Sequence, residues 1–92
     1  MTVQTIYQPD AIANLLRDHI REEIAYDRAD LALTNEFPLV EQGIIDSMGI
    51  LRVVTFLEEK FGFAMEPDDL MLENFATIDA MTAFVVGKLT PA

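Results

Sequence analysis

The chain has 92 residues, about half of them apolar, so it can bury one core but is too short to enclose a deep, many-walled active site as well. It contains no cysteine, which excludes disulfides and thiolate metal sites. Sixteen acidic residues against six basic ones give a formal net charge of −10, which disfavours nucleic acid and membrane partners and favours proteins with basic patches. No signal peptide or membrane-spanning apolar segment is visible, so we expect a cytoplasmic protein.

The N-terminal part predicts one amphipathic helix. Residues 1–8 carry no helical period and are expected to form a loose lead-in. Pro9 and Asp10 suit the first turn of a helix, because proline fixes the backbone and a carboxylate complements the helix dipole. Apolar residues then recur at helical spacing to about residue 26: Ile12, Leu15, Leu16, Ile20 and Ile24.

Residues 31–45 predict a long ordered connection. Asn35, Pro38 and Gly43 break any regular element, yet the segment is rich in large apolar side chains. Such a loop is expected to pack across the helix ends and not to lie free in water. Long ordered loops in small proteins often carry function.

A second helix is predicted from Ser47 to Phe61. Ser47 is a good N-cap, and Gly62 supplies a C-terminal stop. A helical wheel predicts a core stripe of Ile50, Val53, Val54, Leu57 and Phe61. The opposite, exposed face adjoins Ser47 and carries Met48, Gly49, Leu51, Arg52 and Thr55.

The remaining residues predict one short helix and one long one. Residues 68–72 are compatible with a single helical turn capped by Asp68. Thr77 is a suitable cap for a last helix with the inner stripe Ile78, Met81, Phe84, Val85 and Leu89, and residues 90–92 form a tail. The sum is an all-α bundle of three main helices and one short one.

The sequence gives little support for a catalytic site or a metal site. A serine hydrolase needs a base, and the one histidine, His19, is expected at the border of the first helix's core stripe. The segment around Ser47 lacks the first glycine of a Gly-x-Ser-x-Gly elbow. One histidine without cysteine excludes ordinary zinc sites, and the acidic pairs Glu58-Glu59 and Asp68-Asp69 are interpreted as solvated surface.

The remaining chemistry is a hydroxyl displayed where a loop meets a helix. A modifying enzyme can reach a serine there, and the helix dipole and nearby amides tolerate a phosphodiester charge. By physics alone, a cap that has no further role is the favoured interpretation of Ser47, because N-cap serines are common. A cofactor-free helical interaction module therefore remains an alternative.

Three segments resemble the acyl and peptidyl carrier proteins. Residues 39–48 read LVEQGIIDSM, residues 57–62 read LEEKFG at the end of an amphipathic helix, and residues 73–78 read ENFATI before the last helix. The resemblance covers about residues 10–89. It implies a single carrier domain over residues 1–92 with the four-helix carrier bundle. Ser47 would receive 4′-phosphopantetheine, flanked by Asp46 and Met48 as recognition residues.

The resemblance also implies how such a protein works. The arm holds an acyl or aminoacyl group as a thioester, and the carrier is a monomer that other enzymes act on, not a catalyst. The implied partners are a phosphopantetheinyl transferase, an adenylating ligase or acyltransferase, and downstream synthase, condensation or tailoring enzymes.

The exposed face of the second helix departs from the family's fatty-acid carriers, which line it with carboxylates. Gly49 and Arg52 stand where acidic residues are expected, leaving Met48, Leu51, Arg52 and Thr55 as the partner face. This is compatible with a specialised pathway of the non-ribosomal peptide or polyketide type, with general fatty-acid synthesis as the alternative, and drift at a surface position explains the two residues equally well. The rings expected to fill the interior, and so to exclude a long acyl chain, are Phe56, Phe61, Phe63, Phe75 and Phe84.

Overall fold

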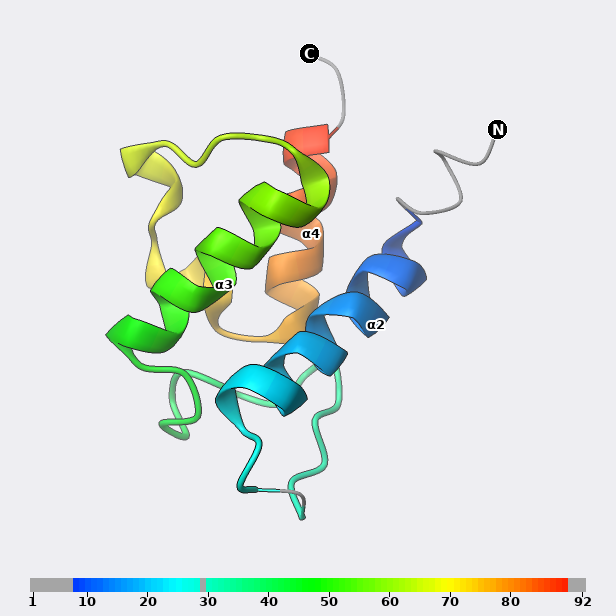
Figure 1. Ribbon diagram of the computed structural model, residues 1–92, viewed down its shortest axis with the longest axis vertical. Helices are drawn as coiled ribbons and strands as arrows, with labels where there is room; N and C mark the ends of the chain where they lie inside the picture. The colour runs from blue at the N-terminus through cyan, green and yellow to red at the C-terminus, as the bar shows by residue number, and fades with distance from the viewer. Residues whose placement is uncertain (1–7, 29, 90–92) are drawn as a thin grey trace.

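A computed structural model of the protein describes residues 8–28 and 30–89, and all their regular structure is helical (Figure 1). The predicted all-α fold is therefore confirmed. Three α-helices form the body: α2 (Pro9–His19), α3 (Ser47–Phe61) and α4 (Ile78–Leu89). Apart from Gln8, the predicted lead-in and tail lie outside the described residues.

The first helix follows its sequence signals and then changes its geometry. It begins at Pro9 with Asp10 in its first turn, and it buries Ile12 and Leu16. It continues as a π-helical turn, η1 (Ile20–Ile24), in which the N–H of Ala25 donates to the carbonyl of Ile20 at 2.7 Å. Turns of this kind occur often beside functional sites. The predicted end at residue 26 lies two residues beyond the observed one, within the uncertainty of helix ends.

The long connection between α2 and α3 is ordered, as predicted. Its Leu33, Leu39 and Ile45 side chains are buried in the core. Backbone hydrogen bonds join it to the segment before α4: the N–H of Leu39 donates to the carbonyl of Ala76 at 2.8 Å. The connection crosses the lower end of the bundle in Figure 1 and so fixes where α3 begins.

One face of each helix supplies the core. The buried side chains of α3 include Val53, Leu57 and Phe61, as predicted, whereas Ile50 and Val54 are half-buried. The last helix buries Ile78, Met81, Thr82 and Val85, and the predicted cap is confirmed because the N–H of Ala80 donates to the Thr77 hydroxyl at 3.0 Å. No helix within the described ranges combines the length and apolarity needed to cross a bilayer.

The predicted short helix at residues 68–72 is wrong. Two 3-10 turns occupy this region: η2 (Pro67–Asp69) and η3 (Leu72–Phe75). Pro67 favours the start of the first turn. Asp69, not Asp68, stabilises this turn, because its carboxylate accepts a hydrogen bond from the N–H of Glu66 at 2.9 Å. The same carboxylate pairs with Lys88 of α4 at 2.8 Å, so Asp69 is not merely solvated surface.

The phenylalanines divide into two groups. Phe61, Phe63, Phe75 and Phe84 form a chain of contacting rings with centroids 6.1 to 6.5 Å apart. The expectation that Phe56 joins them inside is wrong: its ring stacks on His19 of α2 with centroids 4.1 Å apart. Phe56 points to this side because it lies on the α2-facing edge of α3, outside the buried stripe.

Candidate functional site

The site is the junction where the connection enters α3. Asp46 has an extended backbone, and its carboxylate accepts from the N–H of Gly49 at 2.9 Å. The prediction that Ser47 is the N-cap is therefore wrong: Asp46 is the cap and Ser47 is the first helical residue. Aspartate caps at least as well as serine, and only the residue with the extended backbone can direct its side chain to the third amide.

Ser47 lies exposed at this junction. It is the only serine of the chain. Its hydroxyl has no hydrogen-bond partner within residues 8–28 and 30–89. The junction therefore displays one unengaged hydroxyl beside the positive end of the α3 dipole.

Gly49 is buried, which corrects its assignment to the exposed face. A β-carbon at this position would lie 3.2 Å from Cγ2 of Ile45 and 3.5 Å from the Asp46 carboxylate. The buried Ile45 side chain thus packs directly against the first turn of α3. This close approach places the cap, and with it Ser47, at a fixed position relative to the core.

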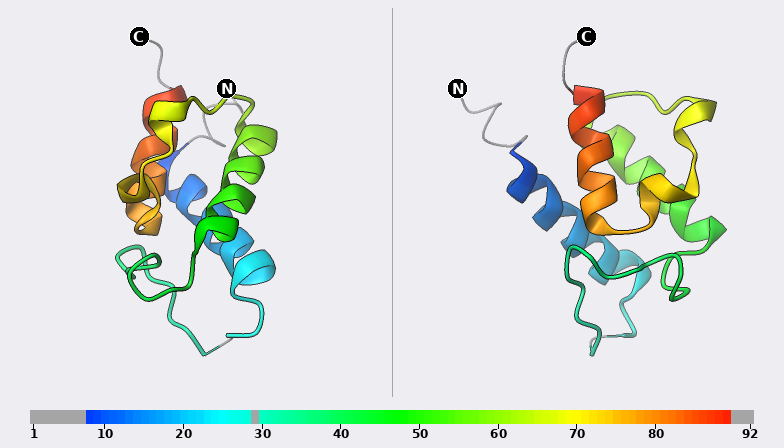
Figure 2. Two further views of the ribbon diagram at one scale, coloured as in Figure 1. Left: turned by 90° about the vertical axis from the view of Figure 1, so that its left-hand side faces the viewer. Right: turned by 180° about the vertical axis from the view of Figure 1, so that it is seen from behind.

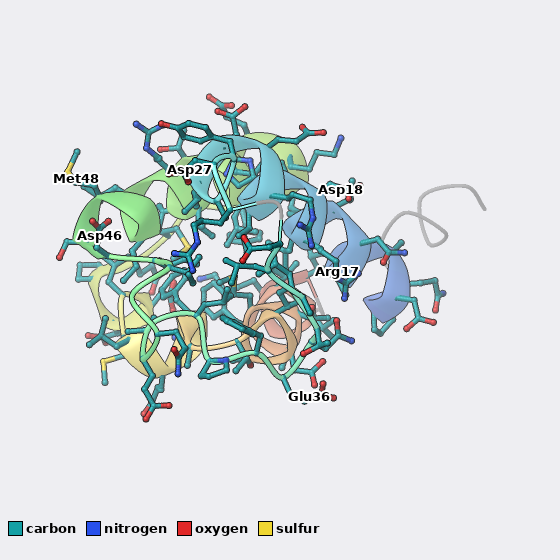
Figure 3. The ribbon with its side chains drawn as sticks, turned by 90° about the horizontal axis from the view of Figure 1, so that it is seen from below. Arg17, Asp18, Asp27, Glu36, Asp46 and Met48 are labelled. Atoms are coloured by element: carbon teal, nitrogen blue, oxygen red, sulfur yellow. The ribbon has the colours of Figure 1, made fainter. Side chains whose placement is uncertain are left out.

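The four residues predicted for the partner face are all exposed on α3. Met48 exposes 65% and Leu51 56% of its surface. The hydroxyl of Thr55 donates to the carbonyl of Leu51 at 3.0 Å. Figure 3 shows Asp46 and Met48 at the outer end of α3, on the side of the molecule away from Arg17.

A second exposed apolar segment was not anticipated. Leu70 and Met71 link η2 to η3, which begins at Leu72, and each of these three residues exposes about half of its surface or more (49%, 51% and 61%). Figure 2 (left) shows this segment and the first turns of α3 on the same side of the molecule. The sequence signal was three consecutive apolar residues, which we interpreted as part of a helical turn.

A groove lies between the exposed face of α3 and the end of the first helix, where α2 continues into η1. It has a volume of about 270 Å³ and is lined by His19, Glu23, Arg52, Thr55, Phe56 and Glu59. The stacked rings of His19 and Phe56 form its apolar part. The His19 Nε2 atom is buried and has no hydrogen-bond partner among the residues that the structure describes, and burial lowers the pKa of this imidazole despite the nearby Glu23. Sequence reasoning placed His19 at a helix border but did not find the groove.

Comparison with known families decides what kind of protein carries this junction. A family model described as "Phosphopantetheine attachment site" matches residues 14–85, which includes the junction, all of α3 and most of α4. The chain belongs to this carrier-protein family. It is a carrier of a phosphopantetheine-linked group and not an enzyme, and like other carrier proteins it interacts with a phosphopantetheinyl transferase and with partner enzymes.

The carrier also has a relative among named proteins. It is 28% identical over 80 residues to the D-alanyl carrier protein of Abiotrophia defectiva, a match that covers 87% of this chain and 94% of the relative. No solved structure gives a significant match.

Proposed function

We propose that Ser47 is the attachment residue of the carrier, and that residues 10–89 form one domain that presents it. The observation that carries this proposal is the exposed hydroxyl of the chain's only serine, which has no hydrogen-bond partner in the described part of the chain and is located at a helix N-terminus within the matched family segment. Attachment joins the Ser47 oxygen to the pantetheine phosphate of coenzyme A. Adenosine 3′,5′-bisphosphate leaves, and the hydroxyl proton passes to a base on the transferase.

The corrected cap fits this role better than the predicted one. Esterifying an N-cap serine would remove the hydrogen bond that begins its helix. Here the Asp46 carboxylate supplies that hydrogen bond, so Ser47 can be modified while α3 stays capped. The phosphodiester charge would lie at the favourable end of the helix dipole. When attached, the arm supplies a thiol that holds the cargo as a thioester.

Partners are proposed to dock on the exposed face of α3 that carries Met48, Leu51, Arg52 and Thr55. Two large apolar side chains there are more than half exposed, and the exposed apolar segment Leu70–Leu72 lies on the same side of the molecule. Arg52 provides the local positive charge that would select among partners. Apolar contacts would supply most of the affinity.

The cargo is proposed to be an aminoacyl group, delivered by a stand-alone adenylating ligase. The D-alanyl carrier among its relatives supports an amino acid over a fatty acid, as does the paucity of carboxylates on the exposed face of α3. A specialised biosynthetic pathway follows from such a cargo. General fatty-acid synthesis is the alternative that the loading experiment must exclude.

Intact-mass spectrometry tests the attachment residue. The carrier is incubated with coenzyme A and a broad-specificity phosphopantetheinyl transferase. A phosphopantetheine adduct is expected on the wild type and on Thr34→Ala, a matched loss of an exposed hydroxyl, but not on Ser47→Ala. An adduct that persists in Ser47→Ala would refute the assignment, and an unmodified wild type would favour the cofactor-free interaction module.

The cargo is tested by offering the phosphopantetheinylated carrier to two kinds of loading enzyme. Amino-acid ligases with ATP and the amino acid are expected to form the thioester, whereas malonyl transferases of fatty-acid synthesis are expected to be inefficient. Efficient malonyl transfer followed by chain elongation would contradict the specialised role.

A further inference from the structure

The groove between α2 and α3 has the features of a binding site for a small organic cation. Its lining brings together two carboxylates, Glu23 and Glu59, and one guanidinium, Arg52, around the stacked rings of His19 and Phe56. Within the described part of the chain, none of these three charged groups forms an ion pair. They are therefore available to a ligand.

The charge balance of the groove indicates the class of ligand. Burial lowers the pKa of His19 below its ordinary value, so the neutral imidazole predominates at pH 7. The two carboxylates and Arg52 then leave one net negative charge. An aminoacyl thioester is a monocation, because its carboxyl group is consumed in the thioester while its ammonium remains. A simple acyl group is neutral and a malonyl group is anionic, so neither matches this charge.

The groove also lies within reach of an arm on Ser47. At a rise of about 1.5 Å per helical residue, Arg52 lies about 8 Å and Glu59 about 18 Å along α3 from Ser47. The arm is a chain of about 14 bonds, which spans roughly 16 Å when extended at the advance per bond of an extended backbone, and the three further bonds from its sulfur to the cargo ammonium bring the span to about 19 Å. Between the serine and the groove it would pass the exposed side chain of Met48 on the same helix face.

We propose that this groove receives the aminoacyl end of the arm, with the ammonium between Glu23 and Glu59 and the thioester carbonyl facing Arg52. The proposal rests on the proposed function of Ser47. Tethering makes weak contacts sufficient, since a short flexible link gives an effective concentration in the millimolar range. The groove would thus hold a charged cargo on the carrier between enzymes and release it when a partner covers α3.

Nuclear magnetic resonance of the loaded carrier tests the proposal. A promiscuous transferase attaches to Ser47 a stable amide analogue of the D-alanyl arm, its N-acetyl counterpart, or the unloaded arm. At pH 6.5 the amine is charged, because α-amino groups titrate near 7.7 to 8.0. Backbone amide signals of Glu23, Arg52 and Phe56 are expected to shift with the D-alanyl arm and not with the other two.

Charge-removing variants identify the groups that hold the ammonium. Glu23→Gln and Glu59→Gln should each lower the docked-to-free ratio about two- to fivefold, as loss of one exposed ion pair does. Glu36→Gln, an equal charge change on an exposed loop residue outside the groove, should leave it unchanged. Both groove carboxylates are exposed and make no hydrogen bond within the described residues, so the variants are expected to fold.

Three outcomes would overturn the proposal: no shift in the groove, an equal shift with the N-acetyl arm, or a shift that appears only when a loading enzyme is added. The last would mean that the groove takes a cationic side chain of the partner. If the transferase leaves Ser47 unmodified, the proposed function itself fails, so the two failures are distinguishable.

Discussion

The carboxylate of Asp46 accepts a hydrogen bond from the backbone N–H of Gly49 at 2.9 Å, so α3 is capped by the residue that precedes Ser47. The helix therefore begins without any contribution from the serine hydroxyl. Two residues that flank Ser47 fix the position of the junction. Asp46, before it, caps the helix, and buried Gly49, two residues after it, lets Ile45 pack against the first turn. The serine between them can change chemically without changing the fold.

Removing the cap is expected to destabilise the protein, whereas removing the serine hydroxyl is not. Asp46→Ala should lower the free energy of unfolding by about 1 kcal/mol, while Asp46→Asn keeps a good cap and should stay close to the wild type. Ser47→Ala should change it by less than about 0.5 kcal/mol. Urea denaturation followed by circular dichroism measures all three. The reverse order, with Ser47→Ala the more damaging, would show that serine is the cap after all.

The two helical glycines should respond differently to alanine. Gly87→Ala in α4 meets nothing within 4 Å and should stabilise the protein by about 0.5 to 1 kcal/mol, because alanine favours the helix. The same change at Gly49 places a β-carbon 3.2 Å from Ile45, and the resulting repacking should cancel or reverse that gain. Thermal or urea unfolding of the two variants tests this. An equal gain at both positions would mean that the junction is not tightly packed.

Arg17 of α2 should be the main side-chain anchor of the long connection. Its Nε donates to the carbonyl of Leu33 at 2.8 Å, and its guanidinium also donates to Asn14 and Asn35. Arg17→Met should cost about 2 kcal/mol and raise amide exchange near Leu33, since hydrogen bonds from charged groups contribute more than neutral ones. Arg21→Met is the matched control. Arg21 makes one longer hydrogen bond, of 3.2 Å to the carbonyl of Leu31, so this variant should lose less unfolding free energy. Equal losses would contradict the anchoring role.

The sequence predicted the helices better than it predicted their ends or the side-chain contacts between segments. Apolar periodicity located the three helices, and Gly62 at φ 80° marks the predicted end of α3. Asp46 and Ser47 are both good caps, so local preference could not choose between them; the packing of Ile45 against Gly49 fixes which backbone is extended. Glu58 and Asp69 were interpreted as solvated, but Glu58 accepts from the N–H of Met65 at 2.9 Å and Asp69 pairs with Lys88. Such contacts between distant segments leave no periodic signal.

The Asp69–Lys88 pair should make stability depend on pH in the acid range. The hydrogen bond from Lys88, aided by the N–H of Glu66, holds the pKa of Asp69 below its ordinary value. Its contribution is therefore fully present above the unfolded-state pKa of about 3.9 and is lost as the pH falls through the lower folded-state value.

Comparison with Asp69→Asn isolates this effect. The difference in unfolding free energy between wild type and variant should be constant from pH 5 to 7 and shrink below about pH 4. Urea titrations at a series of pH values measure it, with Asp68→Asn as the exposed neighbouring control. A difference that is independent of pH down to pH 2 would show that the pair does not form in solution.

Alanine substitutions of the exposed Leu51 and the buried Leu57 of α3 should distinguish an effect on partner docking from an effect on stability. Leu51 is 56% exposed, so Leu51→Ala should change the unfolding free energy by less than about 0.5 kcal/mol. Leu57 is fully buried, so Leu57→Ala should lower the unfolding free energy by about 2 to 5 kcal/mol. If α3 is the partner face, Leu51→Ala should lower kcat/KM for loading about five- to thirtyfold, as loss of a 1 to 2 kcal/mol contact does. Steady-state loading of the phosphopantetheinylated variants measures this. Unchanged loading of Leu51→Ala would move the partner face away from α3, and the segment Leu70–Leu72 would be the next surface to test.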